Sequence, residues 1–221
     1  MPSSARLDAL ASRLEAPLLV TRAPNLRYLI GYTGSNGYLL VRPGGGGVFL
    51  TDGRYGESAQ ALLEEIPQVP VQVYSADLWK ALAGICAGLE QVEVEAGGVT
   101  WEFVRNLEDK AGIAPRPSSG LVEELRRTKD GGELEALRRA ARAGDDAFSS
   151  LAELCGRSVT EADLAWELVA EMRRRGGDQA DWPAIVAAGA AASIPHYETS
   201  RVPLGRGLLL LDYGCEVDGY H

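Results

Sequence analysis

The sequence contains few cysteines, and those it has are widely separated. The three cysteines, Cys86, Cys155 and Cys215, lie far apart in the sequence and form no Cys-x-x-Cys pair. An odd number of cysteines without a secretion signal is typical of reduced thiols in a cytosolic protein. None lies in a recognisable nucleophile motif, so we expect small, buried, apolar side chains.

Long apolar runs and an excess of positive charge are also absent. The longest apolar stretches, such as residues 208–211, are much too short to span a bilayer, and no apolar signal core follows Met1. With 22 basic and 31 acidic residues, the formal net charge is −9, which disfavours binding to nucleic-acid backbones. We therefore expect a cytoplasmic protein with no membrane or nucleic-acid partner.

Several familiar catalytic motifs are missing as well. The sequence has no Gly-x-Ser-x-Gly nucleophile elbow and no His-Glu-x-x-His zinc helix. The glycines at 44–47 lack a following Gly-Lys-Ser/Thr and join two expected strands, so they do not form a phosphate-binding loop. In Thr-Asp-Gly-Arg-Tyr at 51–55 we expect a turn, with Asp52 capping the next helix.

Short strand and helix patterns alternate over the first 95 residues. Strands are expected at 18–20, 38–41, 48–50, 69–74 and 91–95, and helices at 5–13, 55–65 and 78–89. Such alternation predicts an α/β fold with a mixed sheet. Prolines, serines and a glycine at 115–120 then mark a boundary between about 112 and 125. We therefore expect domains at 1–120 and 125–221.

Helical periodicity dominates after this boundary. One stripe of a long helix carries five apolar residues at helical spacing, namely Leu134, Leu137, Ala141, Phe148 and Leu151. A second helix is expected to begin at Thr160, where Asp163 completes a variant capping box. It is expected to end in the Arg-Arg-Arg-Gly-Gly run at 173–177, because arginines favour the negative helix end and glycine supplies the cap.

The last segment is typical of a sheet. Residues 185–187 form a short expected strand, and residues 208–213 form a strand that we expect to be buried. Asp218-Gly219 is a two-residue hairpin turn signal. With that turn, Val217 pairs with Tyr220, and Asp212 faces positions near about 223 and 225, beyond the last residue of the sequence.

Two residues in this segment are candidates for chemistry. His196 lies in a Ser-Ile-Pro-His-Tyr loop, where the preceding proline fixes the backbone in a way that suits either a structural or a functional histidine. Asp212 closes the expected buried strand, and a buried carboxylate is costly to ionise unless it is paired or bound to a metal. The alternative for Asp212 is a turn or capping role.

Six sequence elements, taken in order, resemble the family of creatinase, prolidase and aminopeptidase P. The resemblance covers essentially the whole chain. It implies a creatinase-like N-terminal α/β domain followed by the first part of a pita-bread α/β metallopeptidase domain. The elements are Asn-Leu-Arg-Tyr-Leu-Ile-Gly-Tyr-Thr-Gly at 25–34, Thr-Asp-Gly-Arg-Tyr at 51–55, Leu-Arg-Arg-Thr-Lys-Asp at 125–130, Thr160-Glu161, Ile-Pro-His-Tyr at 194–197, and Leu-Asp-Tyr-Gly at 211–214 with Gly219-Tyr220.

The resemblance implies a proline-specific metallopeptidase that hydrolyses the Xaa-Pro bond at the N-terminus of peptides or dipeptides. Such enzymes hold two divalent ions, most often manganese, with cobalt or zinc as alternatives, between two aspartates, one histidine and two glutamates. By this resemblance Asp212 is the first metal ligand, and His196 lies beside the metals and contacts the substrate as a catalytic residue. The second aspartate would follow Tyr220 by a few residues. We therefore expect a truncated catalytic domain that is inactive alone.

Other functions are compatible with parts of this pattern. A creatinase-like amidinohydrolase uses the same fold without metals, and Asp212 disfavours it. A non-catalytic peptide-binding module keeps the fold but loses the ligands, and the presence of both His196 and Asp212 disfavours that function. The resemblance also implies that the N-terminal half mediates a homodimer, which is compatible with the enzymatic function. We expect the sequence to be a fragment, a truncated gene product or the ordered portion of a longer chain, because Gly219-Tyr220 begins a return strand that is not completed. The alternative is a stable short paralogue, which would need another partner to cover residues 208–211.

Overall fold

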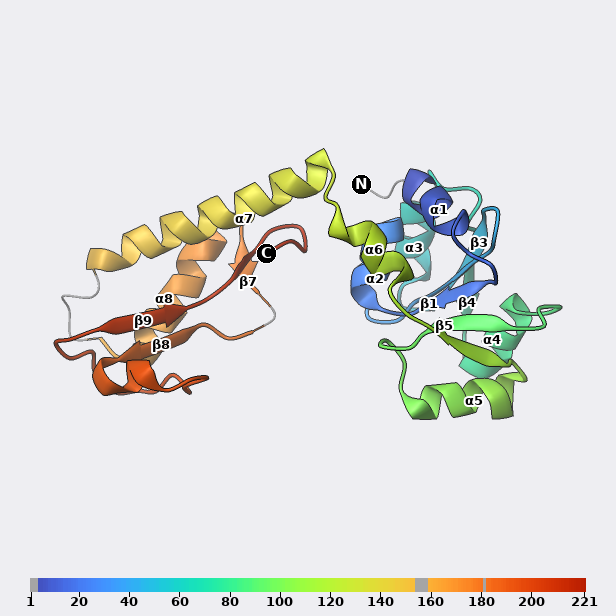
Figure 1. The fold of residues 1–221 in the computed structure, drawn as a ribbon. Coiled ribbons are helices and arrows are strands. Elements are labelled where there is room, and N and C mark those ends of the chain that lie inside the picture. The colour runs from blue at the N-terminus through green and yellow to red at the C-terminus, as the bar shows by residue number, and fades with distance from the viewer. Residues whose placement is uncertain (1–3, 154–158, 181) are drawn as a thin grey trace. The chain divides into compact units, whose positions relative to one another are not determined.

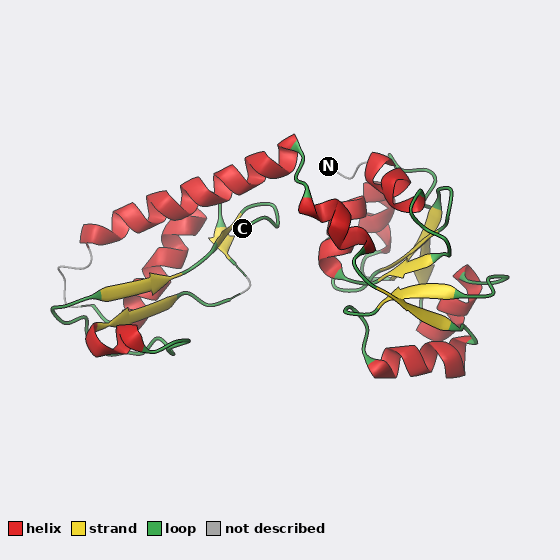
Figure 2. Cartoon of the chain, viewed as in Figure 1, coloured by secondary structure: helices red, strands yellow, loops and turns green. Residues whose placement is uncertain are grey.

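A computed structural model describes residues 4–153, 159–180 and 182–221. The chain divides into two compact units, Met1–Thr128 and Lys129–His221. Both units mix helices with strands, which confirms the α/β prediction (Figures 1 and 2). In the part of the chain that the structure describes, no helix is both long enough and apolar enough to cross a membrane.

A six-stranded mixed sheet forms the centre of the first unit. Its strands lie in the order β4-β3-β2-β1-β5-β6. The β1–β2 and β2–β3 pairs are antiparallel, whereas the three other pairs are parallel. The strands are β1 (Leu18–Val20), β2 (Tyr38–Val41), β3 (Gly47–Asp52), β4 (Val71–Tyr74), β5 (Val92–Glu95) and β6 (Pro115–Ser118).

Helices cover both faces of this sheet (Figure 2). Alternate residues of a strand point to opposite faces, so Leu18 and Val20 join one core and Leu19 joins the other. The first core packs against α1 (Ser4–Ala11), α2 (Ala23–Ile30), α3 (Gly56–Leu63) and α6 (Leu121–Arg127). The second packs against α4 (Leu78–Ile85) and α5 (Trp101–Ala111).

Four elements of the first unit were missed by the sequence prediction: α2, α5, β6 and α6. The prolines at 115 and 117, taken above as boundary signals, lie within β6. This strand is at the edge of the sheet, where proline is tolerated because one side of the strand needs no ladder hydrogen bonds. The helix α2 carries a proline in its first turn and ends at Gly31 with φ 72°, which are ordinary start and stop signals.

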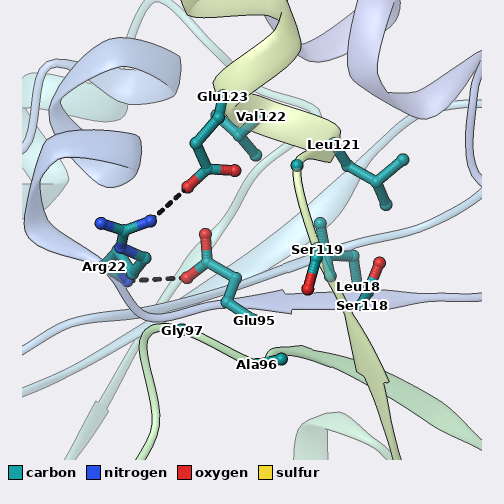
Figure 3. A pocket seen from close by; sticks show the side chains of 11 residues that line it. Leu18, Arg22, Glu95, Ala96, Gly97, Ser118, Ser119, Leu121, Val122 and Glu123 are labelled. Carbon is teal, nitrogen blue, oxygen red and sulfur yellow. Dashed lines mark hydrogen bonds and ion pairs between the residues drawn. The ribbon is translucent and has the colours of Figure 1, made fainter.

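A polar network ties α6 to the rest of the first unit, and Figure 3 shows its Arg22, Glu95 and Glu123 side chains. The amide of Asn25, which is fully buried, donates to Glu95 at 2.5 Å and to Glu123 of α6 at 2.8 Å. Arg22 also pairs with Glu123 at 2.6 Å, and Arg126 donates to the Asn25 side-chain oxygen at 2.9 Å. These contacts explain why the first unit extends through α6 to Thr128, beyond the boundary expected between about 112 and 125.

The second unit combines two long helices with two small antiparallel sheets. The helix α8 packs against α7 and β8 (Figure 1). One sheet pairs β8 with β9, and the other pairs β7 with β10. The elements are α7 (Gly131–Ser150), η1 (Leu151–Glu153), α8 (Glu161–Arg174), β7 (Asp178–Gln179), β8 (Ile185–Ala188), η2 (Gly189–Ser193), β9 (Leu209–Asp212) and β10 (Cys215–Glu216).

The structure confirms the predicted ends of α8. Thr160 accepts the N–H of Asp163, and the Asp163 carboxylate accepts the N–H of Thr160 in return, as a capping box requires. At the other end the helix closes at Arg175, and Gly176 adopts φ 81°. A second capping box, between Asp130 and Glu133, begins α7.

The predicted apolar stripe of α7 is wrong over most of its length. Phe148 is 52% exposed and Leu134 is 40% exposed, although Leu151 is buried. The buried face instead carries small residues, namely Ala136, Ala140, Ala143, Gly144 and Ala147. Small side chains let neighbouring elements approach the helix closely, and a Cβ at Gly144 would lie 3.4 Å from Cys215. Which face of α7 is buried therefore depends on how closely its neighbours can approach, and not on which face carries the larger apolar side chains.

The remaining local predictions have mixed outcomes. Val217 and Tyr220 exchange backbone hydrogen bonds at 2.9 and 3.0 Å across Asp218 and Gly219, which confirms the hairpin turn. The prediction that Asp52 caps a helix is wrong, because α3 begins four residues later and the Asp52 carboxylate instead accepts the N–H of Arg54.

The cysteine environments agree with the sequence. Cys86 and Cys215 are buried free thiols, whereas Cys155 lies outside the described residues. Burial raises the pKa of Cys86 to about 11 and also raises the pKa of Cys215.

Candidate functional site

His196 lies in the segment that connects η2 to β9. The segment turns at Pro195-His196, and the histidine adopts φ 52°, a left-handed backbone that non-glycine residues rarely take. Its side chain is exposed to solvent. Strained backbone of this kind persists only where surrounding contacts enforce it, so the residues that hold the segment matter for the histidine.

Three residues that follow His196 anchor the segment. The N–H of Val186 in β8 donates to Thr199 Oγ1 at 2.8 Å. The Tyr197 hydroxyl donates to Glu161 Oε2 at 3.0 Å, and the Ser200 hydroxyl donates to the same oxygen at 2.8 Å. The segment is thus fixed both to β8 and to the start of α8.

Glu161, the first residue of α8, receives these hydrogen bonds while almost completely buried. Its side chain is 1% exposed, and its Oε1 accepts the N–H of Ala188 at 2.8 Å. Burial raises the pKa of the Glu161 carboxyl, but the hydrogen bonds from Ala188, Ser200 and Tyr197 outweigh this effect and hold the net pKa below its ordinary value. Glu161 is therefore a carboxylate at neutral pH.

Asp212 is the last residue of β9, where the strand register places it opposite Ile185. The strand is not fully buried as expected: Leu208 is 81% exposed, Leu210 is 40% exposed, and Asp212 is exposed as well. The physical reason is that only the face with Leu209 and Leu211 packs into the core of the unit. Because Asp212 is exposed, its carboxylate can ionise without the cost of burial. The argument that a buried aspartate needs a metal or another partner therefore does not apply to Asp212.

His196 and Asp212 belong to segments on opposite edges of β8. Alternate N–H groups of an antiparallel strand point to opposite edges. Those of Val186 and Ala188 are used by Thr199 and Glu161, so they point away from β9. Within the described residues no hydrogen bond joins His196 to Asp212, and β8 is the element that relates their positions.

The end of the chain is attached to α7. The Tyr220 hydroxyl donates to Glu133 Oε1 at 2.9 Å, and Arg139 pairs with Asp218 in the hairpin turn. The ring of His221 makes an edge contact with Trp182, with centroids 5.2 Å apart. The Gly219-Tyr220 element thus has a structural role, which its sequence position alone does not indicate.

The residues at Asp212 do not complete a metal site. Across 4–153, 159–180 and 182–221, no group of three or more His, Cys, Asp or Glu side chains could hold a metal ion. A divalent cation needs several such donors. Asp212 is thus a single candidate ligand, and the full cage expected of a metallopeptidase is not present in the described chain.

Comparison with known families decides the relationship. Residues 6–128 match the creatinase/prolidase N-terminal domain, and residues 135–221 match metallopeptidase family M24. The chain belongs to the creatinase/prolidase family. Its two matches correspond to the two compact units, and the resemblance predicted from the six sequence elements is confirmed.

Individual relatives agree with this placement. An uncharacterised peptidase of Bacillus subtilis, YqhT, is 32% identical over 92% of this chain and 58% of its own length. An Xaa-Pro aminopeptidase of Escherichia coli is 33% identical over 45% of this chain and 23% of its own length. The chain thus spans less than two thirds of the length of these relatives.

Solved structures confirm the fold. An Xaa-Pro dipeptidase from Bacillus anthracis superimposes with a TM-score of 0.88 at 25% identity, over 97% of this chain and 61% of that structure. An X-Pro aminopeptidase from Thermotoga maritima superimposes with a TM-score of 0.83 at 23% identity, over 99% of this chain and 62% of that structure. The chain thus has a creatinase-like N-terminal domain and part of a pita-bread domain.

Sequence reasoning missed the polar residues that support the candidate site. In the sequence, Glu161 stands out only as part of the Thr-Glu element, and Asn25 only as the start of another element. An acidic residue in the first turn of a helix is ordinary, because it interacts favourably with the helix dipole, so Glu161 carries no sequence signal of its burial. The sequence contains no signal for its partners either, because they lie 27 to 39 residues away.

Proposed function

We propose that this protein is a proline-specific metallopeptidase that hydrolyses the bond between an N-terminal residue and a following proline. One observation supports this function above others. The Ile-Pro-His-Tyr segment with His196 and the strand that ends at Asp212 both flank β8, within the residues that match metallopeptidase family M24. The named Xaa-Pro aminopeptidases and dipeptidases among the relatives suggest the substrate class.

The proposed roles differ for the two residues. His196, exposed on its anchored segment, donates a hydrogen bond to the substrate carbonyl or to the negative charge that develops on it. Asp212 contributes one oxygen donor toward a divalent ion, which supplies an activated water and polarises the carbonyl when bound. Because the described residues do not build the whole cage, we expect the 221-residue chain alone to be inactive.

Finer properties follow from the family resemblance. We propose manganese as the preferred ion, with cobalt or zinc as alternatives, because the ligands implied are mainly hard oxygen donors. We also propose a cytoplasmic homodimer that takes proline-containing peptides, with dimer contacts in the first unit. Functionally, the first unit, Met1–Thr128, would serve assembly and the second unit, Lys129–His221, would serve catalysis.

A second candidate is a peptide-binding or assembly module that does not catalyse hydrolysis. The observation that favours it is the single candidate ligand, Asp212, in a described chain without a metal-binding cluster. The two functions differ in a simple test. A module of this kind binds a proline-containing peptide without releasing its N-terminal residue, and chelators do not change the binding.

The proposal is tested with protein purified from its native source. Its intact mass is measured first, because a mass well above 23.6 kDa allows for additional ligands. The protein is then incubated with matched peptides that carry proline or alanine at the second position, with and without added manganese. If the mass is well above 23.6 kDa, manganese-stimulated release from the proline peptide alone supports the proposal, and equal release from both peptides, or none at either, contradicts it. If the mass is 23.6 kDa, the protein has no complete metal site within its described residues, and the peptidase function is contradicted.

A further inference from the structure

The outer edge of β8 is covered by side chains rather than by another strand. An exposed strand edge leaves N–H groups without partners unless other groups satisfy them. The two outward N–H groups of β8 belong to Val186 and Ala188, and they donate to Thr199 Oγ1 and Glu161 Oε1 at 2.8 Å each. Glu161 thus accepts a hydrogen bond that a neighbouring strand would otherwise accept at this edge.

The same carboxylate also binds the segment that carries His196. Four donors converge on Glu161: the Ala188 N–H, the Tyr197 hydroxyl, and the N–H and hydroxyl of Ser200. Backbone hydrogen bonds reinforce the junction, because Glu161 N–H donates to Val202 at 3.0 Å and Ala162 N–H donates to Ser200 at 2.9 Å. Hydrogen bonds to a charged acceptor are among the strongest in proteins, so this carboxylate dominates the junction.

The geometry connects this junction directly to His196. Tyr197, which follows the histidine, is one of the four donors, and Thr199 and Ser200 bind Val186 and Glu161 respectively. His196 itself holds φ 52°, a left-handed conformation that is strained for a residue with a Cβ. The contacts of Tyr197, Thr199 and Ser200 hold the backbone on the C-terminal side of His196, whose own side chain is exposed.

We propose that Glu161 is a positioning residue that holds the 194–200 segment, and with it His196, against the edge of β8. The part of this proposal that concerns substrate rests on the proposed function. Glu161 does not contact the substrate. It acts by keeping the segment in the one conformation that presents the histidine beside β8.

The test uses Glu161→Gln, because an amide keeps the size of the side chain but offers one acceptor oxygen to four donors. Glu198→Gln removes the same charge from an exposed site in the same segment and serves as the charge control. Glu133→Gln changes another buried glutamate, in the capping box at the start of α7, and serves as the control for general loss of stability. If Glu161→Gln does not fold, Tyr197→Phe removes one donor and leaves the carboxylate.

Two nuclear magnetic resonance measurements report on the proposal. Hydrogen exchange follows the N–H groups of Ala188 and Ser200, which we expect to exchange about 10- to 100-fold faster in Glu161→Gln. The imidazole signals of His196 follow binding of the dipeptide glycyl-proline. With two histidines in the chain, His221→Gln completes their assignment. We expect glycyl-proline to shift the His196 signals and Glu161→Gln to weaken this binding about tenfold, with both controls unchanged.

The outcomes separate this proposal from the proposed function. If Glu161→Gln exchanges and binds like the wild-type protein, the positioning role is overturned while the proposed function stands. If glycyl-proline shifts no His196 signal in the wild-type protein, the substrate role of His196 fails. In that case the positioning role is tested by the exchange rates and by the backbone order parameter of residue 196. Faster exchange and a lower order parameter in Glu161→Gln, but not in the two controls, support the positioning role. No change in either quantity overturns the positioning role.

Discussion

Replacing Asn25 with alanine tests the network that fixes α6 to the first unit. The wild-type amide donates two hydrogen bonds to carboxylates and accepts one from Arg126, all at 2.5 to 2.9 Å, in a fully buried position. Burial raises the pKa of the Glu123 carboxyl, yet hydrogen bonds from Asn25 and Arg22 outweigh it and hold the net pKa below the ordinary value. The amide is therefore a partner of charged groups at neutral pH.

The expected cost follows from these contacts. A hydrogen bond to a charged partner contributes about 1.5–3 kcal/mol, and both carboxylates keep some other donors, because Glu95 retains the N–H groups of Thr21 and Arg22. We therefore expect Asn25→Ala to lower the free energy of unfolding of the first unit by about 3–4 kcal/mol. As a matched control, Glu124→Gln breaks an exposed ion pair with Arg127 within α6 and should lower the free energy of unfolding by less than about 1 kcal/mol.

Hydrogen-exchange mass spectrometry in increasing urea measures the two units separately through their own peptides. Asn25→Ala should shift the unfolding of residues up to Thr128 and leave the second unit unchanged. A loss below about 1 kcal/mol, equal to that of the surface control, would refute the claim that the network fixes α6. An equal shift in both units would refute the division of the chain after Thr128.

Two further predictions concern titration and thiol reactivity. The folded-state pKa of Glu161 lies below its ordinary value of 4.5, so its stabilising effect is complete above that pH and is lost as the pH falls through the folded-state pKa. The gap in urea midpoint between wild type and Glu161→Gln should therefore narrow from pH 7 to about pH 3, and a constant gap would contradict this assignment. Cys86, with a pKa of about 11, should resist iodoacetamide at about pH 8 until the protein unfolds, and rapid labelling of its peptide in the native protein would contradict its burial.

Local signals in the sequence predicted the elements whose causes are local. The capping box at Thr160 and Asp163, the glycine stop after Arg175 and the turn at Asp218-Gly219 each depend on residues a few positions apart. Prediction failed where distant packing decides the outcome. The stripe of α7 with Phe148 is exposed because small residues on another face permit closer packing, and no local pattern states which face will be covered.

The candidate site shows the same division. The order of the motifs assigned the chain to the correct family and singled out His196 and Asp212. The exposure of Asp212 could not be predicted in this way, because it depends on the packing of β9, which has only one face in the core. Glu161 escaped notice because its partners come from β8 and from the segment after His196. A buried carboxylate with four donors becomes visible only once the chain is folded.

The most direct test of the proposed function compares Asp212→Asn with Asp218→Asn in manganese-loaded protein from the native source. Both changes remove one exposed aspartate charge near the end of this chain, and asparagine tolerates the left-handed turn position of Asp218. If Asp212 is a metal ligand, Asp212→Asn lowers the turnover of a Xaa-Pro peptide at least about 100-fold and lowers the bound manganese, whereas Asp218→Asn stays near wild type. Turnover and manganese content that equal those of the wild type in both variants would contradict the ligand role of Asp212, and a manganese-loaded wild-type protein without turnover would contradict the metallopeptidase function.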